Sequence, residues 1–296
     1  MYWITLFKKY GRQCLMLTAL FLIPVTGTAQ EQPLAELLER ARAAGIEQSQ
    51  LENIQSRAAD RNVSDEELTG LIGPAVSLAE QNLPSDMIFQ KVMEGLAKGI
   101  PVQQMDQVLQ NIRRSTESVV PVVDSWMGGA EVNEMLASSG ERFDRDLFRN
   151  EMLKAGSKAA SGQTGPALVR DILNSLTDAG AIPAAKPSSV LAGISIISDM
   201  PEVAKRPHAA SAIVVRAIQN NFSAADIQKL PGAMDVAQRR SRLPADAVLE
   251  GVSQQIQGNI TASQILQNLF NGNVGGGIPG NTPPGRENRP GRGGPP

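Results

Sequence analysis

Four carboxylates lie within the short stretch GERFDRDLFRNE, residues 140–151. They are Glu141, Asp144, Asp146 and Glu151. Two positioned carboxylates can hydrolyse a glycosidic bond, one as the acid and the other as the base or nucleophile. Three arginines alternate with these acids, however, and alternating charges are typical of a solvated, ion-paired helix start. We therefore prefer a structural interpretation of this stretch and keep glycan hydrolysis as the alternative.

Other residue types that carry chemistry are scarce. His208 is the one histidine of the chain, and the one cysteine, Cys14, lies within the first 29 residues. A metal site beyond that point would combine Asp and Glu with a single His, a poor donor set for transition metals. We predict no metal, no cofactor and no catalytic residue, and we interpret His208 as a surface or helix-capping residue. The question of enzymatic activity stays open, with a non-enzymatic protein favoured.

Beyond residue 29 the chain has a single tryptophan, Trp126, and no tyrosine. Trp126 follows Asp124 closely and precedes a Gly-Gly pair. Its side chain combines a large apolar ring with one N–H donor. We interpret Trp126 as a packing anchor between two halves of the protein. The alternative is that its ring stacks on a ligand or glycan in a groove.

The first 29 residues have the layout of a signal peptide. Basic residues precede a 12-residue apolar run, 14–25, and the small residues Gly27 and Ala29 follow it. The apolar run is shorter than the roughly 20 residues that a membrane span needs. We expect cleavage after Ala29, no transmembrane span in the remaining chain, and a periplasmic or secreted location. A retained anchor is the alternative.

The charge of the chain after residue 29 disfavours nucleic acid as a partner. Three of the 28 basic residues lie in the first 29, which leaves 25 against 30 acidic residues. Binding to nucleic acid depends on many cations that neutralise phosphates. This part of the chain also has no cysteine, so its stability depends on apolar packing and not on disulfides. We expect a protein or an envelope polymer as the partner.

The stretch MEGLAKGIPVQQM, residues 93–105, has the pattern of a joint between two helices. Gly99 tolerates the left-handed backbone that ends many helices. Pro101 cannot continue the first helix but suits the start of the next. Ile100 and Met105 are five residues apart, the spacing of a hydrophobic staple across a helix start. We therefore expect one helix to end and another to begin here.

The same pattern occurs seven times in the chain. In each case a Gly, Asn or Arg is followed by an apolar residue, and a second apolar residue comes five positions later. The residues that we expect to end a helix are Gly45, Asn62, Asn82, Gly99, Asn221, Arg242 and Asn259. The residues that we expect to begin one include Ser64, Pro101, Ser223 and Thr261. Apolar residues at helical spacing lie between the joints. A strand-like alternation is found at most in residues 211–218, which suit a buried helix equally well, so we predict an all-α fold.

The spacing of the joints also predicts an internal duplication. Residues 62–112 align with residues 221–271, and each copy would contain three short helices. Self-similarity of this kind is typical of stacked helical repeats, either solenoid-like or bundle-like. Whether residues 163–212 form a third, degenerate copy stays an open question, because they lack the apolar pairs five residues apart.

The stretch after residue 115 departs from the pattern. Pro121 lies inside an apolar run and predicts a break or kink in a helix, and Gly128-Gly129 predicts its end. A polar linker and one helix near 144–158 would follow. The last stretch, 272–296, is so rich in Gly and Pro that we expect a flexible tail. The predicted segments are a signal peptide (1–29), an N-terminal helical repeat region (30–115), a linker with an irregular helical segment (116–165), a C-terminal helical repeat region (166–271) and a Gly/Pro/Arg tail (272–296).

The phrase EGLAKGIP, with the preceding LAEQNLPSDMIFQKV, resembles stretches in uncharacterised exported bacterial proteins. Those proteins contain similar helix–Gly–Val/Ile–Pro–helix joints. The resemblance covers residues 35–112, with a fainter echo at 220–270. It implies a bacterial envelope or secreted protein and carries over no activity and no site residue.

These observations favour an exported, non-enzymatic helical-repeat protein that binds or scaffolds a partner in the bacterial envelope. One alternative is a cell-envelope hydrolase of peptidoglycan or another glycan that uses the carboxylates of 141–151. A second alternative is a stress or storage protein without a specific ligand.

Overall fold

The computed structural model describes residues 32–161, 165–201, 207–258 and 260–275. Within these ranges the chain forms thirteen α-helices and one short 3-10 helix, and it forms no strand, so the predicted all-α fold is confirmed. The elements are α1 (Gln32–Ala43), α2 (Gln48–Asp60), α3 (Asp65–Glu80), α4 (Asp86–Lys98), α5 (Val102–Met127), α6 (Ala130–Ser138), α7 (Arg145–Ala160), α8 (Gly165–Asp178), α9 (Pro187–Ser195), η1 (Ile196–Asp199), α10 (Pro207–Gln219), α11 (Ala224–Ser241), α12 (Ala245–Gln257) and α13 (Ala262–Asn271).

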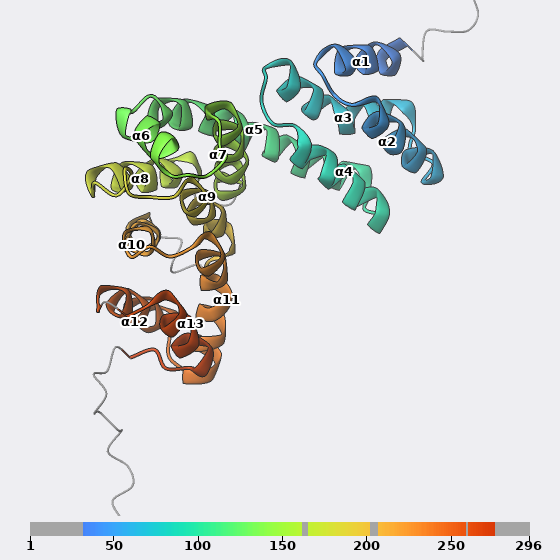
Figure 1. Ribbon diagram of the computed structural model, residues 1–296. Helices are drawn as coiled ribbons and strands as arrows, with labels where there is room; N and C mark the ends of the chain where they lie inside the picture. The colour runs from blue at the N-terminus through green and yellow to red at the C-terminus, as the bar shows by residue number, and fades with distance from the viewer. Residues whose placement is uncertain (1–31, 162–164, 202–206, 259, 276–296) are drawn as a thin grey trace, which may run out of the picture.

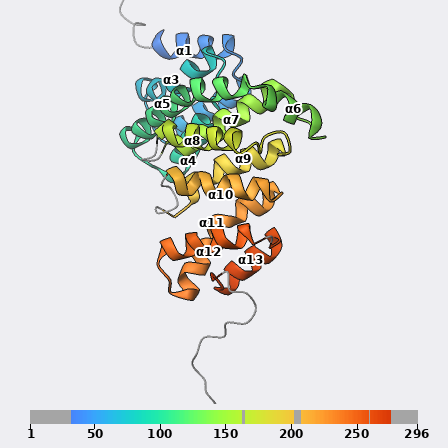
Figure 2. The same cartoon turned by 90° about the vertical axis from the view of Figure 1, so that its left-hand side faces the viewer.

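The helices stack in two series. Each odd-numbered helix packs on the next odd-numbered one, from α1 through α13. The even-numbered helices pack as α2 on α4 and as α8 on α10 on α12, whereas α6 packs chiefly on α5 and does not continue the series. Contact between elements two apart in the chain is typical of an α-solenoid. Figure 2 shows the stack running from α1 at one end to α12 and α13 at the other, and Figure 1 shows α5 between the α1–α4 group and the remaining helices.

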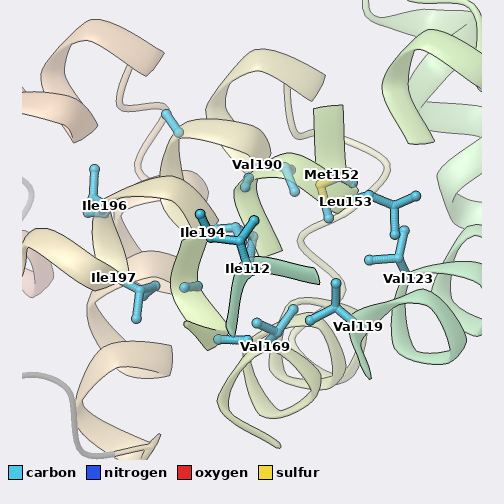
Figure 3. Packing of buried hydrophobic residues seen from close by; sticks show 14 of the residues in the cluster. Ile112, Val119, Val123, Met152, Leu153, Val169, Val190, Ile194, Ile196 and Ile197 are labelled. Carbon is cyan, nitrogen blue, oxygen red and sulfur yellow. The ribbon is translucent and has the colours of Figure 1, made fainter. Parts of the chain in front are cut away.

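Buried aliphatic side chains form one continuous core from Leu34 to Val274. Figure 3 shows the part where α5, α7 and α9 meet, with Val119, Leu153 and Ile194 among the labelled residues. One polar pair lies inside this apolar region: the Thr116 and Ser157 hydroxyl oxygens are 2.8 Å apart, and both residues are fully buried. The Thr116 hydroxyl also donates to the Ile112 carbonyl. The pair is therefore satisfied internally and fixes how α5 and α7 align.

Six of the seven predicted joints lie in the described part of the chain, and each stop residue there has a left-handed backbone. The φ values are 83° at Gly45, 55° at Asn62, 55° at Asn82, 67° at Gly99, 56° at Asn221 and 58° at Arg242. At five joints the next residue's N–H donates to a carbonyl five residues back, as Ile100 does to Gly95 at 3.0 Å. This is the Schellman bond that satisfies a carbonyl at the helix end. Arg242 instead makes a single bond to the Gln238 carbonyl, and Asn259 lies outside the described residues.

The caps at the helix starts follow the sequence pattern. Ser64 accepts from the Glu67 N–H in a complete capping box, and Thr261 does the same with Gln264. Ser223 accepts from the Asp226 N–H. Pro101 stands at the N-cap position, directly before α5. The polar side chains therefore satisfy N–H groups that the first turn of a helix leaves free.

The apolar pairs at the joints are buried unequally. Ile46, Leu83 and Phe222 are buried, whereas Ile100 and Leu243 are 37% and 40% exposed. The residue five positions later is buried at every joint; these residues are Leu51, Leu68, Ile88, Met105, Ile227, Val248 and Ile265. The second member of each pair thus belongs to the core, and the first member does so at only some of the joints.

The two predicted copies share their helix order. The series α3–α4–α5 and α11–α12–α13 each pack helix by helix in the same combinations. They differ in their third helix, because α5 has 26 residues and α13 has 10. The internal duplication stays a prediction.

The segment 116–165 is more helical than the sequence indicates. The helix does not break at Pro121: α5 continues to Met127, and Pro121 is an exposed residue within it. Gly128 then caps α5, as expected. A helix that the sequence did not predict, α6, lies between Gly129 and the polar segment, and α7 begins at Arg145 with Asp144 as its cap.

The C-terminal end of the described chain is fixed on α12. Gly272 ends α13 with φ 81°, and Val274 is buried. The buried Gln255 amide donates to the carbonyls of Asn273 and Val274, at 3.1 and 3.2 Å. The chain therefore stays attached to the stack for at least two residues beyond Gly272.

Candidate functional site

A polar cavity of about 700 Å³ lies between two helix joints and α7. Such a volume is within the range of roughly 300–1,000 Å³ typical of ligand sites. The α1–α2 joint contributes residues 44–47 and Gln50, the α3–α4 joint contributes Ala79 and residues 82–86, and α7 contributes Asn150 and Lys154. The structure thus brings together two joints, at Gly45 and Asn82, that are 37 residues apart in the sequence.

Three amide side chains line this cavity without partners. Within the described residues, the amides of Gln50, Asn82 and Asn150 make no hydrogen bond. The Ser85 hydroxyl does not cap α4 either. An amide offers both N–H donors and a carbonyl acceptor, so these groups can bind a ligand that presents both. Ile46, Leu83 and Pro84 add an apolar patch.

One ion-paired cluster crosses from α4 to α7 at the cavity. The Lys154 ammonium lies 2.9 Å from the Asp86 carboxylate and 3.0 Å from that of Glu151. Burial alone would lower the pKa of Lys154, but its hydrogen bonds to Asp86 and Glu151 and the negative charges of these two groups together outweigh this, and the pKa is raised. With two carboxylates for one ammonium, the cluster carries one excess negative charge. Glu47, also in the lining, adds a second.

The four carboxylates of 141–151 serve separate structural roles. Glu141 accepts from the Ser188 N–H at 2.9 Å and from its hydroxyl at 2.6 Å, and so caps the first turn of α9. Asp144 accepts from the Leu147 N–H at 2.7 Å and caps α7. Glu151 pairs with Lys154, and Asp146 is exposed in the first turn of α7. Two of the four therefore hold helix N-termini, a role different from the ion-paired helix start that the sequence favoured.

The arginines of the same stretch tie α7 to α5. Arg149 donates to both Asp124 oxygens, at 2.6 and 2.9 Å. These hydrogen bonds raise the pKa of Arg149 against the opposing effect of its partial burial. Arg145 donates to the Met127 carbonyl at 2.6 Å, at the end of α5. The charges near 141–151 thus orient α7 on the helix that precedes it.

Trp126 lies in the packing between α5 and α7. It is 8% exposed, and its ring centroid is 6.3 Å from that of Phe148, which is in turn 5.9 Å from that of Phe143. Its indole N–H is buried and makes no hydrogen bond to the described residues. The ring therefore packs in a row of aromatics and presents no face to the polar cavity, whose lining contains no aromatic side chain.

A second, apolar cavity of about 300 Å³ lies between α4 and α5. Its lining includes the exposed Ile100 and Val108, the latter 48% exposed, together with Gly95 and Met105. Glu94 lies at its edge and pairs with Lys91 and Lys98, which lower the pKa of Glu94 to about 2 through hydrogen bonds and charge. The joint that the sequence singled out is thus a structural turn with an apolar hollow beside it.

The remaining chemistry-bearing residues form no site in the described ranges. No group of three or more potential metal ligands occurs there. His208 is the second residue of α10, and its side chain lies outside what the structure describes. None of the described helices combines the length and the hydropathy needed to cross a membrane. Comparisons with protein families, with curated proteins and with solved structures find no match to this chain.

Proposed function

We propose that this chain is an exported, non-enzymatic helical-repeat protein that binds a partner in the bacterial envelope through the polar cavity. The observation that carries the proposal is the set of three unpartnered amides, Gln50, Asn82 and Asn150, around one 700 Å³ space. Gln50 and Asn150 are half-buried, and Asn82 is exposed beside them. A folded protein normally pairs its half-buried polar groups, so the two half-buried amides, together with Asn82, are available to a ligand. The layout of residues 1–29 supports export.

Hydrolysis by the carboxylates of 141–151 is less favoured. A glycosidase needs one carboxylic acid and one carboxylate that are both free to reach the substrate. Glu141 and Asp144 instead accept from backbone N–H groups of α9 and α7. A zymogram against peptidoglycan with each of the four acids changed singly tests this alternative. If the unchanged chain degrades peptidoglycan in the gel, and one substitution abolishes this activity while the variant still folds, that result would overturn the non-enzymatic assignment.

A cross-linking pull-down from envelope extract tests the binding proposal. The cavity variant combines Gln50→Ala, Asn82→Gly and Asn150→Ala, and it uses Gly at position 82 because the backbone there is left-handed. The matched control is Gln107→Ala with Gln228→Ala, two exposed amides away from the cavity. We expect reproducible partners with the unchanged chain and the control, and their loss with the cavity variant. Equal capture by all three proteins would contradict the proposal.

A further inference from the structure

The described chain ends at the opposite end of the stack from the polar cavity. Val274 is held on α12 by Gln255, so the described chain ends beside α12 and α13. The cavity is built by the joints of α1–α4 together with α7. Figures 1 and 2 both place α1–α4 and α12–α13 at different ends of the molecule. The cavity and the end of the described chain therefore lie at different ends of the same copy.

The part of the chain that contains the cavity and the last 21 residues carry opposite net charge. Residues 32–160 contain 20 acidic and 13 basic residues, whereas residues 276–296 contain three arginines and one glutamate. At the cavity, the cluster of Asp86, Glu151 and Lys154 has an excess negative charge, and Glu47 adds another. Guanidinium groups form strong, directional hydrogen bonds with carboxylates.

The backbone chemistry of residues 276–296 matches the amides of the cavity. Six of these 21 residues are proline and seven are glycine. Chains rich in proline favour an extended backbone whose carbonyls have no internal partner. The amide N–H groups of Gln50, Asn82 and Asn150 can donate to such carbonyls. A sugar ring, by contrast, is usually held against an aromatic side chain, and the cavity lining has none.

We propose that residues 276–296 of one copy dock in the polar cavity of a second copy. Arginines of this segment then pair with Glu47 and the Asp86–Glu151 cluster, and its main-chain carbonyls accept from the three amides. The contact joins two different surfaces, so a pair keeps a free cavity on one copy and a free segment on the other. Contacts of this type extend into rings or linear chains of copies. The inference uses the same cavity as the proposed function but needs no envelope partner.

Sedimentation velocity on the chain from residue 30 onward tests the inference. The segment variant carries Arg286→Glu, Arg289→Glu and Arg292→Glu, and the cavity variant is Gln50→Ala, Asn82→Gly and Asn150→Ala. We expect the unchanged chain to form larger species as its concentration rises, with weaker association at higher salt. Each variant alone should associate about tenfold more weakly or worse. The Gln107→Ala, Gln228→Ala control should behave as the unchanged chain.

Mixing the two variants gives the sharper result. The segment variant keeps an intact cavity and the cavity variant keeps an intact segment, so an equimolar mixture should form a one-to-one pair and no longer species. A chain that stays monomeric at every concentration, or a mixture that does not pair, would overturn the inference. If that chain still captured an envelope partner through the cavity, the proposed function would stand without the self-association.

Discussion

Gly251 of α12 lies directly against the main chain of Val274. A methyl group added to Gly251 would overlap the carbonyl oxygen of Val274 and crowd its side chain. Gln255, one turn further along α12, donates to that same carbonyl at 3.2 Å. Gly251 leaves room for the main chain of Val274, and the Gln255 amide binds its carbonyl. Together they attach the last described residues to α12.

We predict that Gly251→Ala destabilises this attachment. The added methyl group would meet the main-chain carbonyl of Val274, which cannot rotate away as a side chain can. Residues around Val274 must therefore move, and the Gln255 hydrogen bonds must break or lengthen. Overpacking of this kind costs about 1–3 kcal/mol. The free energy of unfolding in urea measures the cost, and hydrogen exchange at residues 273–275 locates it.

Gly232→Ala is the matched control for that experiment. Gly232 lies in α11, and a methyl group there would meet no atom within 4 Å. Alanine is favoured over glycine in a helix by roughly 1 kcal/mol, so the control should be neutral or stabilising. Equal destabilisation by both changes would show that the contact with Val274 does not matter.

Arg242 adopts a left-handed backbone without the amide or glycine that usually occupies such a position. Its φ is 58°, and it ends α11. A left-handed conformation costs a residue with a side chain roughly 1–2 kcal/mol. Glycine avoids this cost, but its larger loss of entropy on folding cancels part of the gain. We predict that Arg242→Gly stabilises the protein by about 0.5–1 kcal/mol in urea unfolding.

A glycine in the interior of the same helix should have the opposite effect. Gln228 is an exposed position in α11, and Gln228→Gly should cost about 1 kcal/mol because its backbone is helical. A loss of stability with Arg242→Gly would mean that the arginine side chain contributes more than its backbone costs.

The joints could be predicted from the sequence because their determinants are local. Asn62 and Asn82 tolerate a left-handed backbone, and Ser64 caps the helix three residues before its partner Glu67. Each requirement falls within a few residues of the chain. Gly180 also ends a helix with φ 60° and was missed, because no apolar pair five residues apart follows it.

The cavity could not be predicted, since its parts come from distant stretches. Asn82 and Asn150 lie 68 residues apart, and nothing near either one indicates that α7 passes the α3–α4 joint. The sequence allowed a break or a kink at Pro121, and the break does not occur, because α5 is continuous there. Whether a proline interrupts a helix depends on which side of the helix faces solvent, and packing decides that.

Glu94 is expected to titrate far below an ordinary glutamate. Its carboxylate accepts from Lys91 at 2.6 Å and from Lys98 at 2.5 Å, which lower its pKa to about 2. Because the folded-state pKa is depressed, these pairs stabilise the fold above the ordinary carboxyl pKa, and the contribution is lost as the pH falls toward 2. Carbon-detected NMR of the side-chain carboxyl group measures the pKa directly.

The two lysines provide the internal control for that titration. Lys91→Ala and Lys98→Ala should each raise the pKa of Glu94, and the double change should raise it further. Added salt should also raise it, since both pairs are exposed to solvent. A Glu94 pKa that neither lysine affects would show that the pairs do not persist in solution.

Glu141 should contribute to stability through α9 and not through chemistry. Its carboxylate accepts from the Ser188 N–H and hydroxyl, so Glu141→Ala leaves a first-turn N–H of α9 without its partner. Loss of a capping acceptor costs about 0.5–2 kcal/mol, and urea unfolding measures it. Glu134→Ala, at an exposed position of α6, is the matched control and should be near neutral. If Glu141→Ala left the unfolding free energy unchanged, the cap would be unimportant and the carboxylate would again be a candidate for another role.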